Sequence, residues 1–522
     1  MRGNHSILVL GICIACVFSL VIVLIPLAPA ASATQTPAKL EPARANEAGR
    51  FRVSAPLLSP SAAAALYLPI VLNASSSGPL PSPTSTPGTP TPNPTSTPEP
   101  PLPSPTNTPG PQPGASGGLF LNKTNWTDSP KVAIDGSGGI HMAYNAYGAD
   151  GTGKTPAYYA YCDANCGSSS SWGIASFGDK VDQVELALTK SGHPRMLLYS
   201  HDASFDRLFQ YAACDAACTN SSNWRIANAA TSTYVDAFLW DYSHFSFALD
   251  NLDRPRFVYR KYQGGAAAYA FCDAPDCTQP GAWFETELAP TSYYFSHPSL
   301  VFTTDGKPRM AVGIAYPGQS SDLLFYVTCD SACDQAGNWL YLPLYDGGGA
   351  EFVLRLDSQN RPRLALYQGA PASGTAGFLF YAACDTACTN SANWQSTDIN
   401  LPANSARAPD LAFDAQGRPR IAYHDEANDV LGYAWCSVNC ATENAGWQQT
   451  TAEANSALTA EFDPPIPISC STGYWYSGDH PSLALNSSGN PRIGHKATHL
   501  YGGTCVTDWD WYAVRLTYFN QP

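Results

Sequence analysis

A two-cysteine turn that closes on a tryptophan recurs through the C-terminal part of the chain, and this repeat constrains the fold more than any other feature. Residues 211–224 read YAACDAACTNSSNW, and residues 381–394 read YAACDTACTNSANW. Looser copies stand at 159–172, 269–283, 326–339 and 433–447. The first cysteines of successive copies lie 52, 58, 57, 55 and 52 residues apart. This period is typical of one β-propeller blade.

Each unit holds four short stretches separated by turn signals. In one unit an apolar run at 410–414 leads through a turn to a second run at 417–425, which contains Pro-Arg. A Tyr-rich run then ends in the cysteine turn, and Trp447 opens the fourth stretch. Such a series predicts a four-stranded antiparallel sheet. Pro-Arg at 491–492 marks a further unit without local cysteines, which brings the number of units to seven.

The two ends of the repeat region complement each other. The last unit ends one strand short after the run 511–519, whereas an extra run at 118–124 precedes the first unit. We therefore predict an all-β fold over residues 118–522: a seven-bladed β-propeller of four-stranded antiparallel blades, closed by the N-terminal strand in the last blade. Closure protects the sheet edges. The repeated motif then forms the outer hairpin of a blade, stapled by a disulfide, with the tryptophan packed between blades.

Fourteen of the sixteen cysteines lie beyond the first 33 residues, and their spacing suggests seven pairs. In an exported chain such an even number indicates disulfides. Zinc is the alternative, but a structural zinc site takes four ligands and each motif offers two. The predicted pairs join Cys162 to Cys166, Cys214 to Cys218, Cys272 to Cys277, Cys329 to Cys333, Cys384 to Cys388, Cys436 to Cys440 and Cys470 to Cys505.

The N-terminal region predicts export. Residues 1–33 combine a basic start, a long apolar run and an Ala-Ser-Ala exit, as in a secretory signal peptide. The run is also long enough to span a bilayer, so an uncleaved anchor is the alternative. Residues 34–77 form a segment with a short apolar patch, and residues 78–117 form a Pro/Thr-rich linker of extended geometry. We expect a secreted or cell-surface protein.

The charge balance limits the partners. The chain has a net charge of −14 and only 13% charged residues. A nucleic-acid-binding protein needs a concentrated basic face, so this class is excluded. We expect a glycan or a cell-surface protein as partner, no cofactor, and no membrane contact beyond a possible N-terminal anchor.

The cysteine turn carries an aspartate and ends at a tryptophan, as in Asp215 and Trp224. This arrangement resembles the Asp-box of sialidase-type propellers, whose pattern is Ser-x-Asp-x-Gly-x-Thr-Trp. In this chain nine positions rather than five separate the two residues, a disulfide replaces the glycine turn, and Ser437 replaces one aspartate. The resemblance covers residues 118–522 at the level of the repeat. For a sialidase it implies three substrate-binding arginines, a Tyr–Glu nucleophile pair and an aspartic acid.

Arginines recur at one place in the repeat, six residues after an Asp, Asn or Thr. They are Arg195, Arg256, Arg309, Arg363, Arg420 and Arg492. A residue at the same place in six blades has the same task in each, whereas an active site occurs once. We therefore expect these arginines to bridge turns and to fix the first two strands.

Binding in a propeller usually involves loops over the end of the central channel. The aligned positions that enter each first strand are Ser129, Gln183, His244, His297, Glu351, Ala408 and His480. Three of these, His244, His297 and Glu351, are consecutive around the ring and could hold a divalent metal. The alternative is that the histidines cap turns.

The same loops are rich in aromatic residues. The predicted ligand-binding residues are Tyr234, Trp240, Tyr242, Tyr293, Tyr294, Tyr474, Trp475 and Tyr476. Their rings could stack on sugar faces, or the tyrosines could simply cover blade edges.

We expect a non-catalytic module that binds carbohydrate or protein through these loops. A sialidase-like glycoside hydrolase is the first alternative. Such an enzyme needs two carboxyl groups about 5–9 Å apart in one cleft, and the candidates are Asp425, Glu426 and Asp479. A structural surface spacer is the second alternative.

Overall fold

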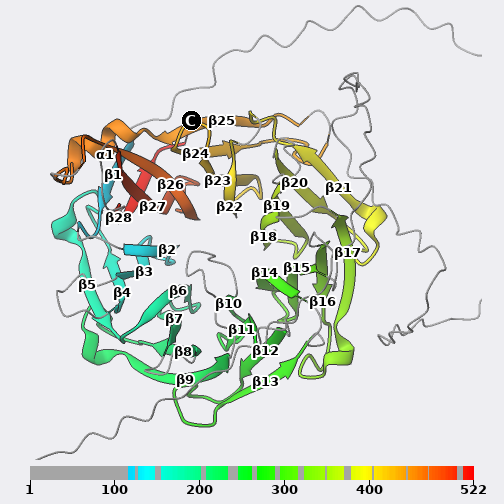
Figure 1. Ribbon diagram of the computed structural model, residues 1–522. Coiled ribbons are helices and arrows are strands. Elements are labelled where there is room, and N and C mark those ends of the chain that lie inside the picture. Colours follow the sequence, from blue (N-terminus) through cyan, green and yellow to red (C-terminus); the bar gives the residue numbers. More distant parts are fainter. Residues whose placement is uncertain are drawn as a thin grey trace, which may run out of the picture. The chain divides into compact units, whose positions relative to one another are not determined.

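The computed structural model contains seven four-stranded antiparallel sheets arranged in a ring (Figure 1). The predicted seven-bladed β-propeller is therefore confirmed. Predicted segments before residue 116 lie outside the described residues. No helix within the described ranges is long and apolar enough to cross a membrane. The structure describes residues 116–123, 127–146, 155–201, 207–232, 245–261, 267–288, 294–315, 323–346, 350–368, 378–402, 405–442, 445–467, 470–502 and 510–521.

The first four blades each consist of four consecutive strands. Blade 1 contains β2 (Thr127–Ile134), β3 (Ile140–Ala146), β4 (Ala157–Cys162) and β5 (Gly173–Phe177). Blade 2 contains β6 (Val181–Leu188), β7 (Pro194–His201), β8 (Arg207–Ala213) and β9 (Arg225–Ser232). Blade 3 contains β10 (Phe245–Leu249), β11 (Pro255–Arg260), β12 (Ala267–Cys272) and β13 (Trp283–Glu287). Blade 4 contains β14 (Tyr294–Phe302), β15 (Pro308–Ala315), β16 (Leu323–Thr328) and β17 (Leu340–Asp346).

Blades 5 and 6 continue the pattern, and blade 7 takes its fourth strand from the N-terminal side. Blade 5 contains β18 (Ala350–Leu356), β19 (Pro362–Gln368), β20 (Phe378–Cys384) and β21 (Trp394–Asp398). Blade 6 contains β22 (Arg407–Phe413), β23 (Pro419–Asp425), β24 (Val430–Trp435) and β25 (Gln448–Glu453). Blade 7 contains β26 (Thr472–Leu485), β27 (Pro491–Gly502), β28 (Trp511–Phe519) and β1 (Ser116–Phe120). The helices are α1 (Asn455–Glu461) and the one-turn η1 (Ser169–Ser171), η2 (Ser221–Asn223), η3 (Ala336–Asn338) and η4 (Ser391–Asn393).

The N-terminal strand closes the ring as predicted. β1 pairs antiparallel with β28, with Ser116 opposite Phe519 and Phe120 opposite Arg515. Gly118 is required there, because a Cβ atom would overlap the carboxylate of Glu453 and the guanidinium of Arg515. Those two side chains form a buried ion pair with Nη2–Oε1 at 2.6 Å.

The predicted outer hairpins are also confirmed. All six local cysteine pairs are disulfides, from Cys162–Cys166 to Cys436–Cys440. Cys470 is disulfide-bonded as well, whereas its predicted partner, Cys505, lies outside the described residues. In each hairpin the tryptophan indole donates to a cysteine carbonyl, as from Trp224 Nε1 to Cys218 O at 2.8 Å.

The tryptophan rings bridge blades, as predicted. Trp224 of blade 2 packs edge-on against Tyr159 of blade 1, with ring centroids 5.1 Å apart. Equivalent pairs between the next blades are Tyr211–Trp283, Tyr269–Trp339, Tyr326–Trp394 and Tyr381–Trp447. Such an aromatic pair adds about 0.5–1.5 kcal/mol beyond its area burial. At the junction of blades 6 and 7, Phe519 takes the place of the tryptophan against Tyr433.

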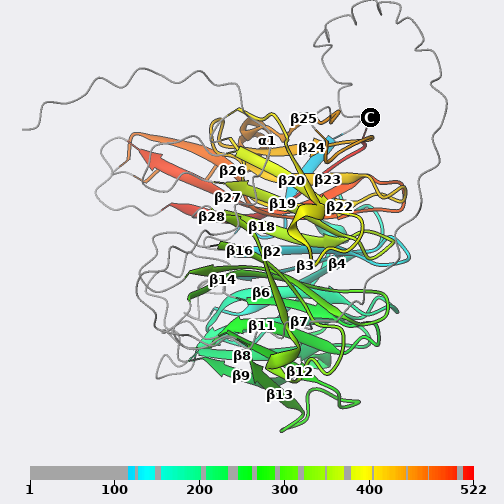
Figure 2. The ribbon, with the colours of Figure 1, turned by 90° about the vertical axis from the view of Figure 1, so that its right-hand side faces the viewer.

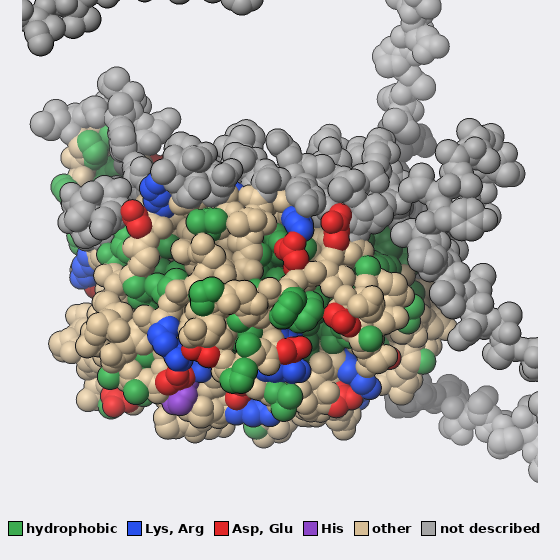
Figure 3. Space-filling model, turned by 90° about the horizontal axis from the view of Figure 1, so that it is seen from below, with side chains coloured by type: hydrophobic (Ala, Val, Ile, Leu, Met, Phe, Trp, Pro, Cys, Tyr) green, Lys and Arg blue, Asp and Glu red, His purple; other side chains and the backbone are tan. Residues whose placement is uncertain are grey.

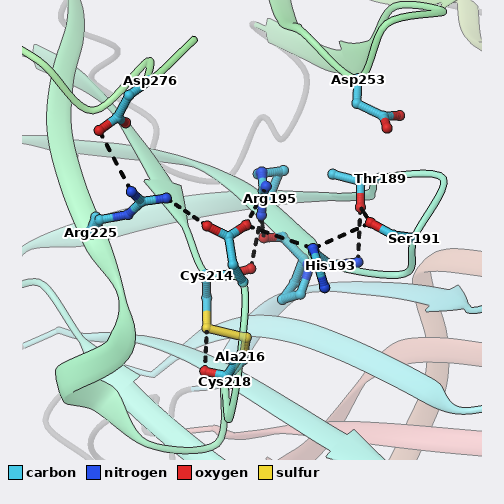
Figure 4. A network of polar contacts seen from close by, with 12 residues as sticks. Thr189, Ser191, His193, Arg195, Cys214, Ala216, Cys218, Arg225, Asp253 and Asp276 are labelled. Carbon is cyan, nitrogen blue, oxygen red and sulfur yellow. Dashed lines mark hydrogen bonds and ion pairs between the residues drawn. A yellow bond between two sulfur atoms is a disulfide. The ribbon is translucent and has the colours of Figure 1, made fainter.

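The recurrent arginines have structural partners. Arg195 donates to the carbonyl of Cys214 at 2.8 Å and to Asp215 at 2.6 Å. Asp215 also binds Arg225, whose other nitrogen lies 3.6 Å from Asp276 of blade 3 (Figure 4). In Figure 3, acidic and basic side chains lie next to one another toward the edge opposite the grey residues. These contacts fix the cysteine turns.

The contact expected to join the first two strands is present where the residue six positions earlier is aspartate. It occurs in the pairs Arg256–Asp250, Arg363–Asp357 and Arg420–Asp414.

The inner strands of adjacent blades are joined by side chains near the central channel. Leu300 N donates to Ser246 Oγ at 2.9 Å, and Val132 N donates to Ser482 Oγ at 3.0 Å. Asp410 accepts from Leu483 N at 2.7 Å at the corresponding place between blades 6 and 7. The channel encloses a cavity of about 520 Å³ lined by these first strands.

Candidate functional site

The two ends of the ring differ in their connections. At one end, the turn end, lie the turns between first and second strands and the cysteine hairpins. At the other end, the loop end, lie the connections between second and third strands and between blades. Figure 2 shows the ring edge-on, with β26 and β27 reaching furthest to the left. These two strands have 14 and 12 residues, whereas the inner strands of the other blades have five to nine.

The sequence alignment of the entry positions is consistent with the structure. Gln183, His297, Glu351, Ala408 and His480 all line the channel. His297, Ala408 and His480 have φ angles of 50°, 46° and 46°. Each of the three precedes a proline and lies at a register shift in its strand pairing. A β-bulge of this kind re-aims side chains at a barrel or channel rim.

Polar side chains from four consecutive blades converge at the loop end, around the junction of blades 6 and 7. We call this group the loop-end cluster. It comprises Glu351, Arg407, His424, Glu426, Tyr476, Asp479, His480, Lys496 and Asp128.

His424 and Tyr476 form the centre of the cluster. The Tyr476 hydroxyl lies 3.1 Å from His424 Nδ1, and the rings meet edge-on at 4.6 Å. His424 is 2% exposed. In the described part of the chain its Nε2 atom has no hydrogen-bond partner. Burial lowers the pKa of His424 to about 4, so the imidazole is neutral at neutral pH.

Asp479 lies between His480 and a buried lysine. One Asp479 oxygen lies 2.6 Å from His480 Nδ1 and the other 3.9 Å from Lys496 Nζ. Lys496 is 3% exposed and also lies 3.1 Å from Asp128 of blade 1, over the ring of Tyr512. Burial disfavours the charged forms of Lys496 and Asp479. The charges of Asp128 and Asp479 nevertheless raise the pKa of Lys496. His480 and Lys496 hold the pKa of Asp479 far below its usual range.

Arg407 closes the other side of the cluster. Its Nη2 atom lies 2.6 Å from Glu351 of blade 5, whose second oxygen accepts from Ala408 N. Its Nη1 atom lies 3.6 Å from Glu426, a looser contact. Arg407 and Glu426 are both partly exposed, so this rim of the cluster is accessible to solvent.

The predicted aromatic binding residues divide into three groups. Tyr474 is 52% exposed and Tyr476 belongs to the cluster. Trp475 is a correction, because it is 1% exposed and packs against Phe120, with its indole donating to Phe462 O at 2.9 Å. Its side chain is therefore a core residue and is not available to a ligand. Outside the described residues or side chains lie Tyr234, Trp240, Tyr242, Tyr293 and the ring of Tyr294.

The predicted metal site is not supported by the two members that the structure describes. Both oxygens of Glu351 are engaged by Arg407 and Ala408. The His297 ring packs edge-on against Phe352. Among the described residues, no group of three His, Cys, Asp or Glu could hold a metal ion. His244 lies outside those residues.

The three catalytic candidates have different surroundings. Asp425 accepts from the side chain and backbone of Asn428 and so caps its own turn. Burial is the main cause that raises the pKa of the Tyr476 hydroxyl, and the negative charges of Asp479 and Glu426 raise it further. A fourth carboxyl group, that of Asp429, also raises the pKa of Tyr476. The pKa of Asp429 is itself raised, by burial and by the charge of Asp425.

Five positions in the cluster were not among the predicted site residues: Asp128, Arg407, His424, His480 and Lys496. His424 directly precedes two of the catalytic candidates, so its neighbours gave a signal. Lys496 stands at the repeat position that holds Arg260 in blade 3 and His424 in blade 6, so a polar residue recurs there without marking a site.

No protein-family model and no curated protein matches the chain. Solved structures are similar at the level of fold. One is a protein of unknown function from Dyadobacter fermentans, 10% identical, covering 78% of this chain and 99% of its own, with a TM-score of 0.42. The polysaccharide lyase Uly1 is 8% identical, covering 75% and 90%, with a TM-score of 0.41.

An α-L-arabinofuranosidase from Fusarium graminearum is 10% identical, covering 77% of this chain and 97% of its own, with a TM-score of 0.39. No Asp-box or sialidase repeat family is shown by these comparisons, so the resemblance noted in the sequence stays a prediction.

Proposed function

We propose that the protein is an exported, non-catalytic binding module that holds a carbohydrate at the loop end of its propeller. The observation that carries the proposal is the loop-end cluster, where hydrogen-bonding side chains from four blades meet, two residues along β26 from the exposed Tyr474. Sugar sites combine an aromatic face with a few fixed polar groups, and the cluster offers both. The six local disulfides support export.

The protonation states of the cluster favour binding over catalysis. The raised pKa of Tyr476 keeps its hydroxyl protonated, and the lowered pKa of His424 keeps its imidazole neutral. Asp479 stays ionised because its pKa is far below the usual range. A general acid must instead have a pKa near the working pH. These three groups are suited to donate and accept fixed hydrogen bonds.

A sialidase-like hydrolase receives less support. Five of the six recurrent arginines bind the carbonyl of a cysteine turn at the turn end, as Arg309 binds Cys329 O and also Asp330, rather than gathering around a ligand. The one observation that favours any hydrolase is Asp429, whose raised pKa would suit a general acid. Hydrolysis of a bound glycan by the wild type, abolished by Asp429→Asn, would replace the binding proposal with an enzymatic one.

The test is binding of the purified protein to a broad glycan array, with Asp330→Asn as a control for charge change at the turn end. We expect discrete glycan signals that persist in chelator and in Asp330→Asn but are lost in His424→Ala. A blank array from a folded protein would contradict carbohydrate binding. The protein would then be a binder of another protein or a structural spacer.

A further inference from the structure

We infer that the carbohydrate carries a free, protonated amine, as a deacetylated amino sugar does. This inference rests on the proposed function and names the ligand class of the same site. Three independent features of the loop-end cluster lead to it: an excess of carboxylates, an ammonium group that the chain itself places there, and a buried imidazole nitrogen without a partner.

The charge balance of the cluster is negative. Four carboxylates, those of Glu351, Glu426, Asp479 and Asp128, outnumber the three basic groups of the cluster, which are Arg407, Lys496 and His480. Two further carboxyl groups lie nearby. Asp425 directly precedes Glu426 in the chain, and Asp429 is close enough to Tyr476 to raise the pKa of its hydroxyl. An anionic sugar would meet like charges at this site, whereas a cationic sugar would be attracted.

The chain's own lysine shows how the cluster accommodates an ammonium group. Lys496 Nζ lies 3.1 Å from Asp128, 3.9 Å from Asp479 and 4.7 Å from the ring centroid of Tyr512. Carboxylates beside an aromatic face are a general arrangement for recognising ammonium groups. Glu426 offers a second such carboxylate on the accessible side, since its contact with Arg407 is 3.6 Å while Glu351 takes the close position at 2.6 Å.

His424 supplies a specific hydrogen bond. Its Nε2 atom is buried and has no partner within the described residues, while Nδ1 faces the Tyr476 hydroxyl. The charges of Asp479, His480, Arg407 and Glu351 all influence the pKa of this imidazole, so these groups lie near it. A buried polar atom left unpaired is costly, and in the tautomer in which Nδ1 donates to the Tyr476 hydroxyl, Nε2 accepts a hydrogen bond from a ligand ammonium or hydroxyl group that reaches it.

The inference is tested by calorimetry with three β-1,4-linked hexasaccharides that share linkage and ring configuration but differ in charge: those of glucosamine, with an amine at C2, of glucose, and of glucuronic acid, with a carboxylate at C6. At about pH 6 a sugar amine is protonated, since amines of this type titrate near 8. We expect the glucosamine oligomer to bind about tenfold more tightly than the glucose oligomer, and the glucuronic acid oligomer to show no binding. The advantage of glucosamine should shrink at high salt and above about pH 9, where the amine is neutral.

Two variants with the same change of charge locate the effect. Glu426→Gln should reduce the preference for glucosamine over glucose, whereas Asp330→Asn, at the turn end, should leave it unchanged. Equal binding of glucosamine and glucose, or tighter binding of glucuronic acid, would overturn the inference while leaving the proposed function intact. A blank result with all three sugars and on the glycan array would overturn both.

Discussion

Blade 5 and blade 7 are built from the same four-strand plan, but they are held together differently. Blade 5 has the cysteine hairpin, a tryptophan that packs on Tyr326 of blade 4, and an arginine that joins Asp357 to the cysteine turn. Blade 7 has no tryptophan at this place. Its arginine, Arg492, donates to its own Pro491 carbonyl and lies over the ring of Tyr518.

Blade 7 replaces these contacts with a buried ionic network. Arg515 pairs with Glu453 of blade 6 and with Glu461 of α1, and Glu461 accepts from Phe120 N of the closing strand. The difference shows that repeated residues maintain the architecture, whereas the departures from the repeat occur where the ring closes and where the loop-end cluster lies. The experiments below separate these two roles.

The largest effect is expected from removing the arginine of the closure network. Arg515→Ala leaves Glu453 buried without its main cation, and we expect the free energy of unfolding to fall by about 3–5 kcal/mol. Arg492→Ala is the matched control from the same blade, with a much smaller loss. Chemical denaturation measures both. Equal losses would show that the network does not replace the missing repeat contacts.

The same network predicts a pH dependence. Burial raises the pKa of Glu453, but hydrogen bonds from His495 and Arg515 dominate and lower it from 4.5 to about 2. A lowered folded-state pKa stabilises the protein above the unfolded value and loses this effect as the carboxylate becomes protonated. The stability gap between wild type and Glu453→Gln should therefore narrow as pH falls from about 4.5 to 2. A gap that stays constant would contradict the network.

Within the regular blades, an arginine that binds an aspartate six residues earlier should contribute more to the free energy of unfolding than an arginine without this aspartate. Arg363 binds the buried Asp357, whereas Arg309 has Thr303 at the equivalent position and binds the exposed Asp330 and turn carbonyls. We expect Arg363→Ala to cost about 3 kcal/mol and Arg309→Ala about 1 kcal/mol in unfolding free energy. The reverse order would mean that the cysteine turn, rather than the first turn, determines the contribution of the arginine.

Loss of a single hairpin disulfide should lower the free energy of unfolding less than loss of Arg515 from the buried ionic network. Replacing both Cys384 and Cys388 by serine removes a closed loop of few residues, for which the chain-entropy relation gives a loss of about 2 kcal/mol. Thermal unfolding of the double variant measures it. A loss as large as that of Arg515→Ala would show that the hairpins hold the ring together more strongly than its closure does.

The smallest effect is expected on binding, without a change in fold. Tyr476→Phe removes the hydroxyl that faces His424, and we expect about a tenfold weaker affinity for an array-positive glycan, equal to one buried hydrogen bond. The same change should keep the fold but lower the free energy of unfolding by about 1 kcal/mol, because buried His424 Nδ1 loses this partner. An unchanged affinity would place the ligand elsewhere at the loop end.

The fold could be predicted from the sequence because its signals repeat. The cysteine turn and Pro-Arg each recur at a constant place, and the incomplete last unit indicated the closing strand that β1 provides. Trp475 shows where this reasoning fails. Side chains alternate across a strand, so Trp475 and its neighbours Tyr474 and Tyr476 had to face opposite ways, but the sequence did not say which face is buried.

The loop-end cluster could not be predicted as a unit, since its residues come from four blades. Arg407 meets Glu351 across 56 positions, and Lys496 meets Asp128 across 368. These pairs depend on strand length and on bulges such as the one at Asp479. No repeated pattern records such contacts, because each occurs once.

Hydrogen–deuterium exchange with and without an array-positive glycan tests the central claim most directly. We expect the ligand to slow exchange in β23, β24 and the long strand β26, around His424 and Tyr476, and to leave the cysteine hairpins at the turn end unchanged. Slower exchange confined to those hairpins would contradict the claim that the ligand binds at the loop-end cluster.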